Sequence, residues 1–440
     1  MGIRAGTAAF GLCLGLSAMF ARAADAREVV IHAGVLIDGT TAQPRPKMSI
    51  VVRDDRIVSV EPGYISRGGA QVIDLSRDTV MPGFIDCHVH VSAKLPSRAN
   101  AVEDAVTHTS LDLAFDAAAF SRAMLLQGFT SARDVGGGDE TVALKHAIED
   151  GKVSGPRLWV SLEPLGPTGG HSDPSNGFDP ALSEPAWANS IVDGPDSALR
   201  QVRDHRKRGA DLIKIMPSGG IASTGDDPKS QLMTNAEIQA TVDAAHSLGM
   251  KVAAHLYPPG AIENAVRAGV DSVEHGSFAT ADTFALMKAH GTYLVPTLTV
   301  FEIYLKAARE HPELLAPGTP AKELAYDPQA MKNLPLALSS GVRIAYGTDI
   351  GEGDHAMEFG LLVRGGMSPA DALLAATRNA ADLIGDPQDI GSVQPGRFAD
   401  LVAVEGDPMK DAALFDRISF VMKGGIVYKQ DGRPTVAAAE

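Results

Sequence analysis

The chain contains little cysteine and few aromatic residues. Cysteine occurs twice in 440 residues, at Cys13 and Cys87, and aromatic residues make up 5% against 45% apolar residues. Cys13 lies in an N-terminal segment that we expect to be removed, so the mature chain would have no internal disulfide. Cys87 is expected to be a buried structural thiol. This composition is typical of a globular protein stabilised by its apolar core.

Positive charge is also in short supply. The chain has 39 Lys and Arg against 54 Asp and Glu, a formal net charge of −15. This balance argues against a nucleic-acid partner or an anionic membrane. We expect a small-molecule partner and a homo-oligomer.

The first 23 residues differ from the rest. Arg4 precedes an uncharged run of small and apolar residues, Ala5 to Ala21, which is followed by the small-x-small site Ala21-Arg22-Ala23. The run is too short and too rich in glycine for a membrane span. It predicts a signal peptide over residues 1–23 and export to the periplasm or medium. A lipoprotein signal at Cys13 is disfavoured because Leu12 replaces the small residue expected before it.

Both ends of the remaining chain are rich in strand patterns. The predicted strands cover 29–37, 49–52, 56–60 and 71–75 near the N-terminus, and 400–404, 418–422 and 426–428 near the C-terminus. We expect residues 24–82 and 391–430 to form one small β-sandwich domain, with 431–440 as a tail.

Strand and helix patterns alternate in the middle, residues 83–390. Strands are expected over 84–90, 130–135, 157–162, 212–216, 252–257, 272–275, 293–300 and 344–349, with helices including 110–126, 198–208, 235–248, 281–290 and 369–384. Eight alternations predict an α/β fold, a (β/α)8 TIM barrel. An open doubly wound sheet is the alternative, but Gly136-Gly137-Gly138 lacks the spacing of a phosphate-binding fingerprint.

Ligand-type residues recur where the predicted strands end. They are His88, His90, Lys214, His255, His275 and Asp349. Side chains two residues apart on a strand point the same way, so His88 and His90 can converge on one transition-metal ion. Because active sites of such barrels lie at the C-terminal ends of the strands, all six are expected on one rim. Taken singly, each histidine could be a satisfied half-buried residue, and Asp349 could cap a helix.

Lys214 lies alone in the apolar segment Leu212-Ile-Lys-Ile-Met216. An unpaired buried ammonium is costly, and metal ions would repel it. Capture of CO2 by the neutral amine would turn this cation into a carbamate that can bridge two metals. We therefore expect Lys214 to be modified to N6-carboxylysine.

The motifs resemble those of the metal-dependent amidohydrolase superfamily. They are Pro82-Gly-Phe-Ile-Asp-Cys-His-Val-His90, Gly128-Phe-Thr-Ser-Ala-Arg-Asp-Val-Gly-Gly137, Thr168-Gly-Gly-His171, Gly209-Ala-Asp-Leu-Ile-Lys-Ile215, Ala254-His-Leu-Tyr257, Ser272-Val-Glu-His-Gly276, Gly347-Thr-Asp349 and Gly391-Ser-Val-Gln-Pro-Gly-Arg-Phe-Ala-Asp-Leu-Val402. They appear in the family's order over about residues 28–430. The chain is most similar to the imidazolonepropionase-like branch, which contains Xaa-Pro dipeptidases, related carboxypeptidases and ochratoxin-hydrolysing amidohydrolases.

The resemblance implies two zinc ions per chain, bridged by carbamylated Lys214 and a hydroxide. His88, His90 and Asp349 would hold the buried ion, and His255 and His275 the more exposed one. Asp349 would take the proton of the attacking water and later deliver it to the leaving amine. His171 and Tyr257 would act in catalysis and substrate binding, and Ser218 would also contact substrate.

The expected activity is hydrolysis of an amide to release a C-terminal amino acid from a dipeptide or N-acyl amino acid, including ochratoxin-type amides. Ring opening of a cyclic amide, as in imidazolonepropionase, is the alternative, although export and the bridging lysine weigh against it. A non-catalytic scaffold is a further alternative, but the metal ligands are all present. Arg98, Lys229 and Arg364 are candidates for binding the substrate carboxylate, with Ser218 and the Gly219-Gly220 amides as an uncharged option.

Overall fold

A computed structural model of the protein describes residues 2, 28–95, 107–176, 179 and 190–435. The expected signal peptide and Arg98 lie outside these residues. The strands are β1 (Glu28–Ile37), β2 (Pro44–Arg53), β3 (Arg56–Pro62), β4 (Gln71–Pro82), β5 (Phe84–Val89), β6 (Phe129–Asp134), β7 (Arg157–Val160), β8 (Leu212–Ile215), β9 (Lys251–Leu256), β10 (Ser272–His275), β11 (Tyr293–Val295), β12 (Leu401–Glu405), β13 (Phe420–Lys423), β14 (Ile426–Gln430) and β15 (Arg433–Pro434).

Helices separate the central strands. They are α2 (Ser110–Leu126), α3 (Asp139–Glu149), α4 (Pro195–Arg208), α5 (Asn235–Ser247), α6 (Pro259–Ala268), α7 (Ala281–His290), α8 (Leu298–Glu310), α9 (Thr319–Tyr326), α10 (Pro328–Ser340), α11 (Met357–Arg364), α12 (Pro369–Leu374) and α13 (Ala380–Ile384), with short η1 (Pro312–Leu314), η2 (Ala375–Asn379) and η3 (Ala412–Asp416). Among the described residues, no helix is both long and apolar enough to cross a membrane.

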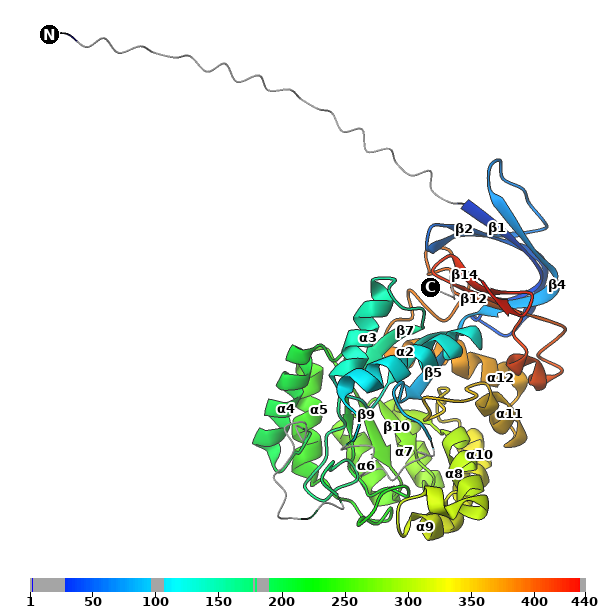
Figure 1. Ribbon diagram of the computed structural model, residues 1–440. Coiled ribbons are helices and arrows are strands. Elements are labelled where there is room, and N and C mark those ends of the chain that lie inside the picture. The colour runs from blue at the N-terminus through cyan, green and yellow to red at the C-terminus, as the bar shows by residue number, and fades with distance from the viewer. Residues whose placement is uncertain (1, 3–27, 96–106, 177–178, 180–189, 436–440) are drawn as a thin grey trace.

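The two ends of the chain meet in one eight-stranded sheet, ordered β15-β14-β13-β12-β4-β1-β2-β3. β12 pairs antiparallel with β4, with Val402 opposite Met81, so blue and red strands lie side by side in the curved sheet of Figure 1. Apolar residues from both ends share one core cluster that includes Ile31, Ile50 and Phe420. Strands from both ends of the chain therefore share one sheet and one core, while the β-sandwich domain and its boundaries stay predictions.

The central strands are parallel and form two sheets, β5-β6-β7 and β11-β10-β9-β8. Isolated parallel bridges extend their edges: Leu165 pairs with Ile215, Leu294 with Ile344, and Ile350 with Val89. The strand expected over 344–349 is wrong as a regular strand, because only Ile344 and, just beyond it, Ile350 form bridges. The α/β class is confirmed. Within the described residues the parallel strands form two sheets connected by isolated bridges, and their closure into a (β/α)8 barrel stays a prediction.

The strand expected over residues 293–300 is also too long. β11 ends at Val295, before Pro296, and α8 begins at Leu298. The backbone N–H groups of Leu298 and Thr299 donate to the buried carboxylate of Glu358, at 3.0 and 2.7 Å. These hydrogen bonds satisfy N–H groups that have no partner within the helix, and the Glu358 carboxyl group that accepts them comes from α11, sixty residues away in sequence. The apolar pattern of residues 293–300 could not by itself reveal this contact with Glu358.

Candidate active site and metal centre

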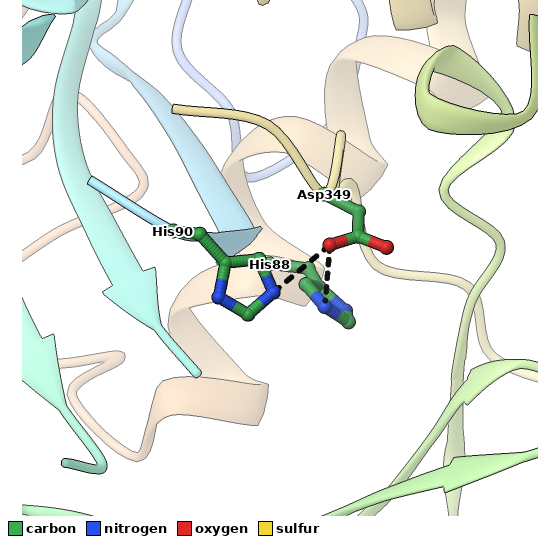
Figure 2. Close-up of side chains that lie close together, drawn as sticks. All are labelled: His88, His90 and Asp349. Carbon is green, nitrogen blue, oxygen red and sulfur yellow. Dashed lines mark ion pairs between the residues drawn. The ribbon is translucent and has the colours of Figure 1, made fainter. Parts of the chain in front are cut away.

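The side chains of His88 and His90, at the end of β5, point toward that of Asp349, which lies next to the bridge residue Ile350. Asp349 Oδ1 lies 3.2 Å from His88 Nε2 and 2.9 Å from His90 Nε2, as Figure 2 shows. Asp349 Oδ2 lies 3.9 Å from His275 Nε2. The ligand atoms of His88, His90 and Asp349 all lie within 4.8 Å of one another, close enough to hold one metal ion.

The other predicted ligands face the same cavity. Its volume is about 210 Å³, and its wall includes His88, His90, His171, Lys214, His255, Tyr257, His275 and Asp349. The ring centroids of His255 and His275 are 4.6 Å apart, and those of His88 and His275 are 5.3 Å apart. The structure thus brings together all six residues expected on one rim.

The chemistry of these donors fits metal ions. Burial lowers the pKa of His255 and His275 well below the usual value, which keeps their imidazoles neutral as metal binding requires. His255 Nε2 is buried without a hydrogen-bond partner, and a metal ion would satisfy it. Burial also lowers the pKa of Lys214 to about 8. Near neutral pH a fraction of this side chain is therefore the neutral amine that reacts with CO2.

Asp349 is held as a carboxylate. Burial opposes its ionisation, but the neighbouring His88 and His90 outweigh burial and keep its pKa well below the usual range. Its backbone has φ of 61°, and His275 has φ of 69°. Both values lie in the left-handed region that non-glycine residues seldom adopt, and such strain concentrates at functional sites.

A buried pair that sequence analysis missed orients His88. Glu274 accepts from His88 Nδ1 at 2.7 Å and from Arg133 Nη2 at 2.8 Å. Arg133 also donates to Ser272 Oγ at 3.0 Å. Fixing Nδ1 in this way leaves His88 Nε2 free for a metal. Both residues lie within the family motifs, but strand alternation gave no sign that their side chains meet.

A second buried network supports the segment that carries Asp349. Asp86 accepts from the backbone N–H of Thr348 at 3.1 Å and from Thr348 Oγ1 at 2.7 Å. His355 Nδ1 lies 3.0 Å from the same carboxylate. Asp86 belongs to the Pro82–His90 motif, two residues before His88. His355 was overlooked because it follows the last predicted strand in an irregular segment.

His171 lines the cavity and stacks on His255, with ring centroids 4.3 Å apart. Its Nδ1 is 3.6 Å from Asp226 Oδ2. Asp226 also accepts from the N–H of Gly220 at 2.8 Å. A Cβ at Gly220 would lie only 2.0 Å from His171 Nδ1, so only glycine permits this imidazole position. The sequence indicated His171 but not its partner Asp226.

Tyr257 and Ser218 differ in where they point. Tyr257 lines the cavity, and its ring lies 5.3 Å from that of His275. Burial raises its pKa well above the usual value, so its hydroxyl stays a donor. Ser218 is not among the cavity-lining residues: its hydroxyl donates to His255 O at 3.4 Å and accepts from Tyr257 N–H at 3.2 Å. The structure therefore favours a positioning role for Ser218 over substrate contact.

Two candidates for carboxylate binding lie away from the cavity. Lys229 is exposed, with Nζ 5.0 Å from the centroid of the Tyr326 ring, and Arg364 Nη2 pairs with Glu302 at 3.4 Å. Neither lines the cavity. Cys87 is fully buried with its Sγ 3.8 Å from Ala380 O, in agreement with the structural role expected.

Imidazole and carboxylate ligands at the ends of parallel strands are typical of metal-dependent α/β enzymes. Comparison with known proteins gives the family. Residues 79–429 match the amidohydrolase family. The chain is 32% identical to ochratoxinase of Aspergillus niger over 431 residues, covering 93% of this chain and 88% of that protein.

Solved structures agree. A Xaa-Pro dipeptidase with bound methionine superposes with a TM-score of 0.85 and 33% identity, covering 91% of this chain and 100% of the other. A prolidase complexed with N-methylphosphonate-L-proline gives 0.84 and 34%, covering 92% and 100%. The structure of A. niger ochratoxinase gives 0.82 and 30%, covering 92% and 96%. The chain belongs to the amidohydrolase family, and it is a hydrolase acting on amide bonds.

Proposed function

We propose that the protein is a binuclear zinc hydrolase that releases a C-terminal amino acid from dipeptides or N-acyl amino acids, including ochratoxin-type amides. The observation that carries this proposal is the convergence of six ligand-type side chains on one cavity. The names of the relatives support the substrate class, since they include a Xaa-Pro dipeptidase, a prolidase and an ochratoxinase.

Two groups of ligands would hold the metals. His88, His90 and Asp349 would bind one ion, His255 and His275 the other, and carboxylated Lys214 would bridge them. Bound zinc would polarise the scissile carbonyl and acidify a water molecule. In this arrangement Lys214 would contribute negative charge instead of an ammonium, which suits a site that holds two divalent cations.

The protein's own groups would handle protons and substrate. Asp349 would accept the proton of the attacking water and pass it to the leaving amine, because its carboxylate is held ionised beside both ligand groups. Tyr257 would donate its hydroxyl proton in a hydrogen bond to the oxyanion. His171, backed by Asp226, would bind the substrate carbonyl beside His255.

A metal analysis joined to a substrate screen tests the proposal. Purified enzyme should contain two zinc ions per chain, show the mass of one carboxylated lysine under native conditions, and cleave N-acyl amino acids or dipeptides. The corresponding C-terminal amides should be much poorer substrates, because a site built for a free carboxylate is left unsatisfied. One metal per active chain, or a strong preference for cyclic amides, would favour the ring-opening alternative.

Four further expectations stay predictions. They are the closure of the parallel strands into a barrel, the domain boundaries at residues 82 and 390, export after cleavage near residue 23, and the homo-oligomer. Size measurement and intact mass of protein from the native host would test the last two.

A further inference from the structure

Two buried carboxyl groups lie away from the metal ligands, at the wall built by α8, α9 and the start of α10. Glu323 lines the same cavity as His88 and Asp349 and is only 2% exposed. Asp327 follows one helical turn later and is also 2% exposed, with its N–H bonded to Glu323 O at 3.0 Å. The helical spacing places both side chains on one face.

Neither carboxyl group has the cation that burial normally demands. Burial and the neighbouring Glu323 raise the pKa of Asp327 to about 11, so the two carboxyl groups share a proton and carry at most one negative charge at neutral pH. Outside this pair, Glu323 Oε1 and both carboxyl oxygens of Asp327 are buried without a hydrogen-bond partner. The adjacent Lys322 is engaged elsewhere, donating to Ser223 O at 2.7 Å and to Asp226 O at 3.0 Å. Buried carboxylates without partners are rare in folded proteins, and each needs an explanation.

The surroundings suit an organic cation. Phe301 and Tyr304, three residues apart on α8, line the cavity together with Glu323. The Phe301 ring lies 5.6 Å from that of His275, so this wall continues directly from the metal ligands. Aromatic faces and carboxylates together favour ammonium or guanidinium groups, whereas an apolar substrate side chain would leave the carboxyl groups unsatisfied.

We propose that Glu323 and Asp327 form a subsite for a cationic group of the substrate, an ammonium or guanidinium carried by the amide that is hydrolysed. This inference rests on the proposed function and narrows it: the physiological substrate would be a basic dipeptide or N-acyl amino acid. The cation has two possible sources, the side chain of the released amino acid or the free amino terminus of a dipeptide.

Isosteric substrate pairs separate these sources. Propionyl-L-arginine is compared with propionyl-L-citrulline, which lacks only the side-chain charge. L-alanyl-L-methionine is compared with propionyl-L-methionine, which lacks only the amino group. We expect one pair to show a preference of about 10–100-fold in kcat/KM for the charged member, the size expected of hydrogen bonds between charged groups.

Substitution then assigns the preference to the carboxyl pair. In Glu323→Gln the charged-to-neutral ratio should fall towards one, and Asp327→Asn, prepared separately in case the first variant fails to fold, should lower it in the same direction. Glu302→Gln is the matched control, since Glu302 is an exposed carboxylate beside Phe301 on α8. It removes the same net charge and should leave the ratio unchanged.

Calorimetric binding to the wild-type enzyme gives a readout independent of turnover, with L-arginine compared with L-citrulline for the side-chain charge and L-alaninamide compared with propionamide for the amino group. Tighter binding of the charged member of either pair, lost in the Glu323 variant, supports the subsite even if no amide tested is hydrolysed. A charged-to-neutral ratio near one in both pairs, or a ratio unchanged in both variants, overturns the cation subsite. If the enzyme still hydrolyses neutral amides in a metal-dependent way, the proposed function stands without the subsite.

Discussion

Two pairs of buried acidic side chains lie at or just behind the same cavity, and their surroundings differ. Around the metal ligands, each acidic side chain has partners: Glu274 binds Arg133 and His88, and Asp349 lies against His88 and His90. At α9, Glu323 and Asp327 have oxygen atoms without a partner outside their own pair. The first group is organised by the protein itself, whereas the second is left for a ligand to complete.

The difference appears in the pKa values. Burial raises the pKa of Glu323 to about 7, whereas Arg133 and His88 overcome the effect of burial and hold the pKa of Glu274 well below its usual range. Burial alone therefore does not decide the charge of a carboxyl group; its neighbours do.

The largest loss is expected from Lys214→Ala. Without the proposed bridge, both metals should bind poorly, and activity should fall by more than about 10⁴-fold, beyond the range of a lost general acid or base. Added formate or acetate should restore part of the activity by occupying the bridging position. Elemental analysis and turnover measure both effects.

Lys423→Met is the matched control for that variant. Lys423 is also a buried lysine whose pKa burial lowers to about 8, but it lies on β13 and donates to Gly155 O. Its substitution should leave the metal content unchanged. Full activity and two metals in Lys214→Ala would refute the bridging role.

Asp349→Asn should separate proton transfer from metal binding. Asparagine keeps the size and one possible oxygen ligand but cannot accept a proton, so kcat should fall by about 10²–10⁴-fold with metal partly retained. Steady-state kinetics at measured metal occupancy would test this. Wild-type turnover in the variant would contradict the assigned mechanism.

Glu274→Gln should weaken both the fold and the metal site. It leaves Arg133 buried without its anionic partner, a change that costs about 3–5 kcal/mol of unfolding free energy. It also releases His88 Nδ1, which should lower metal affinity by about 10–100-fold. Denaturant unfolding and metal titration measure the two effects. Glu358→Gln, which alters a buried carboxyl group that caps α8, should keep the metal affinity.

Asp226→Asn should have a smaller effect, acting through His171. Loss of the ion pair should lower kcat/KM by about 5–10-fold while both metals stay bound. In kcat/KM, the double variant with His171→Ala should be no worse than His171→Ala alone if Asp226 acts on catalysis through that imidazole. Its further bonds to Gly220, Ser223 and Lys322 should affect stability instead. Additive losses would show that Asp226 has another role.

The smallest expected effect concerns stability and pH in the ligand-free protein. The folded-state pKa of Glu323 is raised from its model-peptide value of 4.5 to about 7, so folding retains a proton that the unfolded chain releases first. Stability should therefore fall by about 1–3 kcal/mol as pH rises from 4.5 to 7. Glu323→Gln should remove this part of the slope, and a cationic ligand should offset it. A slope unchanged by the substitution would contradict the assignment.

Much of the site follows from the sequence because strand periodicity and strand ends are local properties. The alternation of apolar residues placed His88 and His90 on one face of a strand, and the apolar segment around Lys214 marked that lysine as exceptional. The helices over residues 110–126 and 281–290 have the predicted bounds, since Thr109 and Thr280 provide N-caps and Gly291 ends the second. These signals lie within a few residues of the feature they predict.

Contacts between distant residues were decided only by the tertiary structure. Glu358 accepts a hydrogen bond from the N–H of Leu298, the first residue of α8, which is 60 residues away in the sequence. Glu274 and Arg133 are 141 residues apart, and His355 and Asp86 are 269 residues apart. Folding likewise removes the carboxyl groups of Glu323 and Asp327 from water without supplying a hydrogen-bond partner outside their own pair. The sequence determined which residues could bind metal; packing decided which carboxylates are paired and which still require a ligand.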